Sequence, residues 1–223
     1  MMSEPHPASR NVLDQIAALP RSHRPLIVCD VDEVILHLAS HLEQYLKDLG
    51  LVFLSFEYKL TGNIARRGET EPLPSEEVRR HLETFFDSES HRQRPVDGAD
   101  KALKQLSDMW DIVFLTNLPG AHNKAIREKL LSDCGFPYPV VTNAGPKGGA
   151  VAALSAGRPA PVVFIDDSHI NHRSVRASLP SSVQIQFIAD QRFRTVLTPD
   201  PHIALLTSDW AETAAFISAI VTN

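Results

Sequence analysis

The sequence has 223 residues, of which 43% are hydrophobic, so it can bury a full core. This length favours one domain that carries a substantial insertion over two independent domains. The 22 Lys and Arg residues against 27 Asp and Glu residues give a net charge of −5, which argues against a nucleic-acid polymer as partner.

The two cysteines, Cys29 and Cys134, are too few for a disulfide framework and fit a reducing cytoplasm. Cys29 lies in an apolar run, where it is expected to be buried. Residues 1–24 lack the basic and then apolar succession of an export signal. No apolar stretch approaches the roughly 20 residues that a membrane span requires, so we expect a cytoplasmic protein with no membrane partner. The oligomeric state has no signature in the sequence.

Short apolar runs rich in β-branched residues alternate with stretches of helical spacing, which predicts an α/β fold. The expected strands are Leu26–Cys29, Ile112–Leu115, Val140–Thr142, Val162–Ile165 and Val183–Ile188. The expected helices between and after them are Gly98–Met109, Ala121–Leu131, Gly149–Leu154 and Asp209–Val221. Strands that are apolar throughout are typical of a parallel sheet covered on both faces, so we predict a three-layer Rossmann-like core.

Residues 35–94 interrupt this alternation and show two stretches of helical spacing but no clean strand signal. We predict that they form a small inserted helical subdomain, a cap, on a core made of residues 1–34 and 95–223. Two arginine pairs of this insertion could contact an anionic substrate, although such pairs typically form a solvated face. They are Arg66 with Arg67 and Arg79 with Arg80.

Three predicted strands run directly into functional groups at their carboxyl ends. These groups are Asp30 and Asp32, Thr116 and Asn117, and Asp166 and Asp167. The carboxyl ends of parallel strands meet at one edge of an open sheet, so we expect the six residues to converge. Taken singly, an Asp or Thr after a strand is often only a helix N-cap, and the hypothesis therefore depends on the ordered set.

Gathering four carboxylates requires a positive charge among them, since each pair at roughly 4 Å repels by about 4 kcal/mol at an effective dielectric constant near 20. Oxygen ligands without a His and Cys cluster favour Mg²⁺ over Zn²⁺. Lys147 could add a further positive charge, although a lone lysine at the start of a helix is typically a solvated surface residue.

Mg²⁺ beside a free carboxylate suits phosphoryl transfer, with Asp30 attacking phosphorus to form an aspartyl-phosphate. Asp32 could then protonate the leaving group and later activate water, a role that contributes about 10²–10⁴ in rate. Thr116 and the backbone amides after it would bind phosphate oxygens.

Four segments, in this order, resemble the motifs of the haloacid dehalogenase superfamily. They are DVDEV from Asp30, FLTN ending at Asn117, the lone Lys147, and VVFIDDSHIN from Val162. The resemblance spans Pro25 to about Ile188. It implies that residues 35–94 are a C1-type helical cap and that RPVDG, from Arg94, leads the chain back into the core.

The resemblance also implies a role for each matching position. Asp30 would be the nucleophile, and Asp32 would be the general acid and base. Phosphate would be bound by Thr116 with the adjacent Asn117, and by Lys147. The metal would be held by Asp166 and Asp167, together with the carboxylate of Asp30 and the backbone carbonyl of Asp32. The presence of Asp32 favours phosphoryl chemistry over dehalogenation. Glu33 departs from the family phosphatases, which usually have Gly after the second Asp.

The sequence therefore predicts a Mg²⁺-dependent phosphatase that hydrolyses a small phosphate monoester, its partner being a small phosphorylated metabolite. Three alternatives remain open at this point: a phosphotransferase or phosphomutase, a 5′-nucleotidase, and a catalytically weak protein that binds a phosphorylated ligand beside Glu33. GPKGG, from Gly145, lacks the spacing of a phosphate-binding loop and is interpreted as a turn. His169 and His172 are interpreted as surface or capping residues, and Trp110 and Trp210 as core residues.

Overall fold

The computed structural model describes residues 5–57, 59–158, 160–195 and 200–220. Its centre is a parallel sheet with the strand order β5-β4-β1-β6-β7-β8. These strands are β1 (Leu26–Cys29), β4 (Asp111–Asn117), β5 (Val140–Asn143), β6 (Val162–Asp166), β7 (Val183–Phe187) and β8 (Leu205–Thr207). The predicted α/β class is confirmed.

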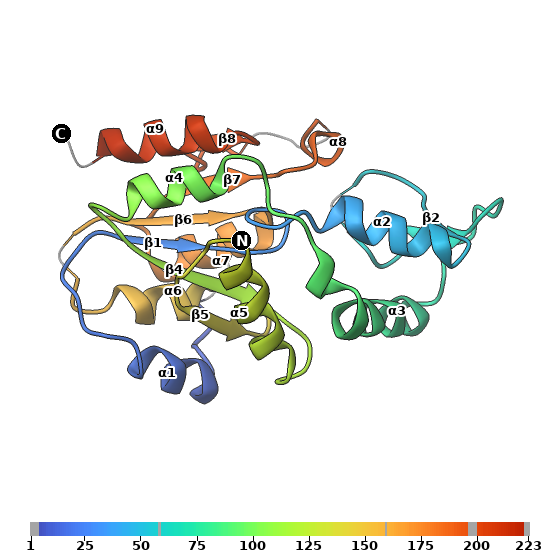
Figure 1. The fold of residues 1–223 in the computed structure, drawn as a ribbon, viewed down its shortest axis with the longest axis horizontal. Helices are drawn as coiled ribbons and strands as arrows, with labels where there is room; N and C mark the ends of the chain where they lie inside the picture. The colour runs from blue at the N-terminus through green and yellow to red at the C-terminus, as the bar shows by residue number, and fades with distance from the viewer. Residues whose placement is uncertain (1–4, 58, 159, 196–199, 221–223) are drawn as a thin grey trace.

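Alternate residues of each central strand face opposite sides of the sheet, which gives two separate apolar clusters. Ile27 and Cys29 of β1 pack on one side, whereas Leu26 and Val28 pack on the other. The first side is covered by α4 (Ala99–Leu106), α5 (Asn123–Asp133) and α9 (Trp210–Ile220), the second by α1 (Arg10–Ala17), α6 (Gly148–Ser155) and α7 (His169–Ser178). Figure 1 shows α4 and α9 side by side across the sheet from α1 and α6.

The five predicted strands are all present, and their bounds shift by one or two residues at most. Four described elements of the core were not predicted: α1, α7, β8 and the short helix α8 (Gln191–Arg194). The closing helix is α9, and the last residue predicted for it, Val221, lies outside the described residues. Trp110, Trp210 and Cys29 are buried as expected, and neither Cys29 nor Cys134 forms a disulfide.

Residues of the predicted insertion form a separate lobe beside the sheet, which we call the cap (Figure 1). Its elements are α2 (Ala39–Asp48), β2 (Leu51–Phe53), β3 (Ile64–Arg66), α3 (Ser75–Ser88) and the 3₁₀ turn η1 (Ser90–Arg92). The expectation that this segment has no strands is wrong, because β2 and β3 pair antiparallel. Three-residue strands are too short to show alternation in the sequence. Leu42, Ile64 and Phe85 belong to the apolar cluster inside this lobe.

The two chain segments that join the cap to the core run side by side. The amide of His37 donates to the carbonyl of Arg94 at 2.9 Å, and the amide of Val96 donates to the carbonyl of Ile35 at 2.8 Å. Trp210 of α9 donates its indole N–H to the carbonyl of Val34 at 3.0 Å, which fixes the first segment to the core. None of the described helices is both long enough and apolar enough to cross a membrane.

Helices α6 and α7 approach each other at Gly148, the first residue of α6. A Cβ placed on Gly148 would lie 2.3 Å from the carbonyl oxygen of Ser174 on α7. The amide of Gly148 donates to the hydroxyl of Ser174 at 3.0 Å. The close contact therefore fixes the start of α6, directly after Lys147.

We expect Gly148→Ala to lower the free energy of unfolding by about 2 kcal/mol, because the added methyl group must displace backbone. Gly→Ala inside a helix normally has the opposite sign. Chemical denaturation of both forms measures the change, with Ser155→Ala at the other end of α6 as a control that should stay within about 0.5 kcal/mol. A Gly148→Ala protein as stable as the wild type would contradict the close packing.

Candidate active site at the carboxyl ends of the strands

Asp30 directly follows β1, the strand that lies between β4 and β6 in the sheet. Its amide continues the ladder by donating to the carbonyl of Ile165 at 2.8 Å. One carboxylate oxygen, Oδ1, accepts from the amide of Val31 at 2.7 Å and lies 2.8 Å from Nζ of Lys147. The other oxygen, Oδ2, has no hydrogen-bond partner within the described part of the chain and is available to a ligand.

Three carboxylates meet at this point, as the spacing of the strand ends predicts. Oxygens of Asp30, Asp166 and Asp167 lie within 4.8 Å of one another, and all three residues are buried. Asp166 also accepts from the side-chain amide of Asn171 at 3.0 Å and from the amide of Ser168 at 2.9 Å. The cluster is therefore held by local hydrogen bonds as well as by the sheet.

Crowding of these acids shifts their protonation. Burial, together with the charges of Asp166 and Asp32, raises the pKa of Asp30 to about 7 although Lys147 opposes the shift. Burial, followed by the charges of Asp30 and Glu33, raises the pKa of Asp167 well above its usual range. Burial and neighbouring negative charge thus disfavour the ionised forms of Asp30 and Asp167.

Lys147 is fully buried beneath this cluster. Its Nζ lies 2.7 Å from Oδ2 of Asp166 and 2.8 Å from Oδ1 of Asp30. Burial alone would lower the pKa of Lys147, but the charges of Asp166 and Asp30 raise it above its usual value. Lys147 is thus an internal cation, and the surface interpretation of this residue is wrong.

Asp32 lies beside the cluster but has its own partners. Its Oδ1 accepts from Nε2 of Gln93 at 2.8 Å and from Nη1 of Arg127 at 2.9 Å. Both partners are buried, Gln93 on the segment that returns from the cap and Arg127 on α5. These contacts orient the side chain of Asp32, which remains in the wall of the pocket.

A cavity of about 390 Å³ lies over these strand ends, with Asp30, Asp32, Thr116 and Asp167 in its lining. The hydroxyl oxygen of Thr116 is buried and has no hydrogen-bond partner within the described residues. A buried hydroxyl without a partner is uncommon in proteins, so it is a donor suited to an oxygen-rich ligand. Asn117 also lines the cavity and donates to the carbonyl of Gly145 at 3.0 Å.

Glu33 does not enter the cavity, although it follows Asp32 in the chain. Its carboxylate accepts from the amides of Leu38 and Ala39 at 3.1 and 2.7 Å and from the amide of Asp190 at 2.6 Å. It therefore caps the N-terminus of α2 and ties the cap to the segment after β7. The structure thus removes the reason for expecting Glu33 to impede a ligand.

Several residues that support the site were not identified from the sequence. His172 is buried, and its Nε2 lies 2.9 Å from the carbonyl oxygen of Asp166, so its interpretation as a surface or capping residue is wrong. Arg127 had a detectable signal, because it stands four residues from both Asn123 and Leu131 on the buried face of α5. Gln93 had no such signal, since its contact with Asp32 depends on the path of the chain between the lobes.

The remaining features of the sequence lie away from the cavity. Arg66 pairs with Glu77 and Arg79 pairs with Glu76 on the exposed surface of the cap, which agrees with a solvated face. His169 is exposed at the start of α7 and does not line the cavity, which agrees with its interpretation as a surface residue.

The donor set fits a hard divalent cation. Asp30, Asp166 and Asp167 present carboxylate oxygens within 4.8 Å of one another, and no described His or Cys joins this group. The raised pKa values of Asp30 and Asp167 mean that their ionised forms are disfavoured, and the charge of such an ion would favour them. Mg²⁺ therefore fits the residues present.

No protein-family model and no curated protein matches the sequence. Solved structures do match. A haloacid dehalogenase-like protein of unknown function from Agrobacterium tumefaciens is 16% identical, with a TM-score of 0.57 over 88% of this chain and 98% of that one. This chain has the haloacid dehalogenase-like fold.

Two further structures share the haloacid dehalogenase-like fold with this chain. A protein from Bacillus subtilis described as a HAD-hydrolase bound to magnesium is 12% identical, with a TM-score of 0.55 over 88% of this chain and 99% of that one. A haloacid dehalogenase-like hydrolase from Streptococcus pneumoniae is 9% identical, with a TM-score of 0.56 over 87% of this chain and 98% of that one.

We expect the metal-free protein to lose stability as the pH rises. A carboxyl group whose pKa is raised from 3.8 to about 7 keeps its proton in the folded state at a pH where the unfolded chain releases it. The contribution of Asp30 is therefore complete below its unfolded pKa and is lost as the pH passes through about 7. Asp30→Asn should remove this loss, and the part of it that falls between about pH 5.5 and about pH 8 is on the order of 2 kcal/mol.

The measurement is the melting temperature of wild type and of Asp30→Asn at about pH 5.5 and about pH 8, in EDTA and in excess Mg²⁺. We expect Mg²⁺ to stabilise the wild type most at the higher pH and the variant much less. An equal effect of Mg²⁺ on both proteins would mean that the ion binds elsewhere.

The buried pair of Asp32 and Arg127 can be tested with a double-mutant cycle. We expect Arg127→Met to cost about 3 kcal/mol of stability, because it leaves a buried carboxylate with one donor fewer. Combining it with Asp32→Asn should recover at least about 1 kcal/mol of that cost. Lys129→Met, which breaks an exposed pair with Asp133 on the same helix, should change stability by less than about 1 kcal/mol. Additive losses in the cycle would argue against the pair.

Proposed function

We propose that this protein is a Mg²⁺-dependent hydrolase of a small phosphate monoester and that Asp30 forms an aspartyl-phosphate intermediate. The observation that carries the proposal is the buried group of Asp30, Asp166 and Asp167 at the floor of a cavity. A catalytic role for a hydrolase of this kind also agrees with the haloacid dehalogenase-like fold, although the fold alone does not specify a reaction.

Asp30 is suited to attack phosphorus. Its Oδ1 is fixed by Val31 and Lys147, so Oδ2 can be directed at a phosphoryl group in the cavity. The bond from Oδ2 to phosphorus would form as the bond from phosphorus to the leaving oxygen breaks. The bound metal would supply positive charge to the phosphate oxygens and to the carboxylates of Asp30, Asp166 and Asp167.

Thr116 and Lys147 are suited to hold the phosphoryl group. The unpartnered hydroxyl of Thr116 can donate to a phosphate oxygen, and Asn117 lies beside it in the cavity lining. Lys147 places a fixed cation beside the nucleophile, where charge on the phosphoryl oxygens develops. Both groups are held before a ligand arrives, so little reorganisation is needed.

Asp32 is suited to move the proton. It lines the cavity, and Gln93 and Arg127 hold its Oδ1 while Oδ2 has no recorded partner among the described residues. In the first step it would give a proton to the leaving oxygen. In the second step it would take a proton from water, whose oxygen attacks phosphorus and releases Asp30 and inorganic phosphate.

The test is phosphate release from a panel of monoesters with Mg²⁺, for wild type and Asp30→Asn. We expect the variant to lose activity by a factor of about 10⁴ or more, since it lacks the nucleophile. Asp133→Asn, which changes an exposed carboxylate on α5, is the matched control and should retain activity. Equal phosphate release by wild type and Asp30→Asn would contradict the proposal, as would full activity in EDTA.

A further inference from the structure

The cavity over the strand ends has a distinct distribution of charge. Its charged lining residues, among those that the structure describes, are Asp30, Asp32 and Asp167, and none is Lys, Arg or His. The two buried cations nearby are already paired, Lys147 with Asp30 and Asp166 and Arg127 with Asp32. A second anionic group on a ligand would therefore find no side-chain cation among the described residues of this lining.

Among its described residues, the cap contributes only apolar side chains to this cavity. Leu38, at the start of α2, and Phe86, on α3, are half-buried in its lining. Ile170 of α7 adds a third apolar side chain and is 54% exposed, although large apolar residues are usually covered. The cavity is thus acidic at its buried floor, and its less buried lining combines these apolar side chains with the uncharged polar residues Asn117 and Ser168.

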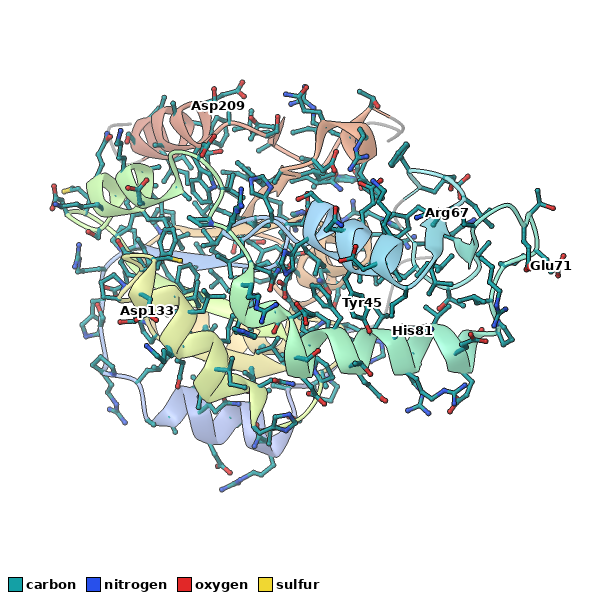
Figure 2. The ribbon with its side chains drawn as sticks, turned by 45° about the vertical axis from the view of Figure 1, so that its right-hand side comes forward. Tyr45, Arg67, Glu71, His81, Asp133 and Asp209 are labelled. Carbon is teal, nitrogen blue, oxygen red and sulfur yellow. The ribbon has the colours of Figure 1, made fainter. Side chains whose placement is uncertain are left out.

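None of the described charged side chains of the cap lines this cavity. Figure 2 shows Arg67 and Glu71 on the part of the lobe that extends away from the central sheet. Arg66 is paired with Glu77 and Arg92 with Glu89, and neither arginine lines this cavity. No described residue of the cap is therefore placed to bind a carboxylate or a second phosphate of a ligand in this cavity.

From this arrangement we infer that the substrate is a phosphate monoester with an uncharged, apolar organic group, and that Phe86, Leu38 and Ile170 select it. The inference rests on the proposed phosphatase activity and adds the substrate class. The phosphoryl group would occupy the floor beside Asp30 and Thr116, and the organic group would contact the three apolar side chains. Aromatic rings are favoured because Phe86 offers a ring for edge or stacking contact.

The test compares three primary monoesters whose leaving alcohols have similar acidity: benzyl phosphate, para-carboxybenzyl phosphate and glycerol phosphate. We expect kcat/KM for benzyl phosphate to exceed that for the carboxylated ester by roughly tenfold or more, because the added carboxylate would lie against apolar side chains with no described side-chain cation in the lining. It should exceed that for glycerol phosphate by roughly tenfold, because glycerol gains nothing from an apolar wall.

Ile170→Lys introduces a positive charge into the lining of the same cavity. Ile170 is exposed, so the fold should tolerate the substitution. It should raise kcat/KM for para-carboxybenzyl phosphate several-fold relative to benzyl phosphate. Met109→Lys is the matched control, since Met109 is 60% exposed and lies outside the cavity lining, and its selectivity should equal that of the wild type. Phe86→Ala should raise KM for benzyl phosphate roughly tenfold and leave that for glycerol phosphate unchanged.

The outcomes separate the two proposals. Similar kcat/KM values for the benzyl and carboxybenzyl esters, or identical selectivity in Ile170→Lys and Met109→Lys, would overturn the substrate class while the phosphatase activity stands. Phosphate release no greater than that of Asp30→Asn from any of the three esters and from the wider panel would overturn the activity and the substrate class together. If Phe86→Ala unfolds, as its melting temperature would show, the Ile170 comparison still decides.

Discussion

Repulsion among buried carboxylates is the constraint on which this site depends. Asp30 and Asp166 follow positions that are paired in register, Cys29 of β1 and Ile165 of β6. Neighbouring strands lie roughly 4.8 Å apart, so these carboxylates cannot separate without breaking the sheet. Burial, together with the charges of Asp166 and Asp32, raises the pKa of Asp30 even though Lys147 lies 2.8 Å away and opposes the shift. The fold thus holds negatively charged groups close together, and a bound cation would stabilise their ionised forms.

Hydrogen bonds from outside the motifs keep the surrounding backbone in place. His172 and Gln186 contact the carbonyl oxygens of Asp166 and Asp167 at 2.9 Å each.

Glu33 has a φ of 63°, a left-handed conformation that glycine adopts without strain. Its side chain offsets that cost by accepting three backbone hydrogen bonds, two of them at the start of α2. The departure from glycine at this position therefore joins the cap to the core instead of altering the cavity.

The sheet and the charged floor of the cavity could be predicted because both follow from local patterns. Apolar runs such as Leu26–Cys29 and Val162–Ile165 predict buried strands, and Asp30 and Asp166 directly follow them. Burial of Lys147 could not be predicted, since it depends on the close approach of α6 and α7. Short strands such as Leu205–Thr207 have too few residues for a hydrophobic pattern to be detected in the sequence. This strand forms because β7 provides backbone hydrogen-bond partners for it.

The core contributes charged side chains to the cavity, whereas the cap contributes apolar ones. This difference explains which residues of the site could be predicted from the sequence. The described carboxylates and buried cations of the site all belong to the core, where strand register and helix packing fix charges at short distances. The cap offers apolar contacts through Leu38 and Phe86, which require only that a surface face the cavity. Charges at strand ends leave a pattern of residues in order, whereas an apolar wall can be built from residues at many positions. The charged residues of the site can therefore be predicted from sequence motifs in this fold. The apolar residues that line the cavity can be identified only from the structure, in which the two lobes lie together.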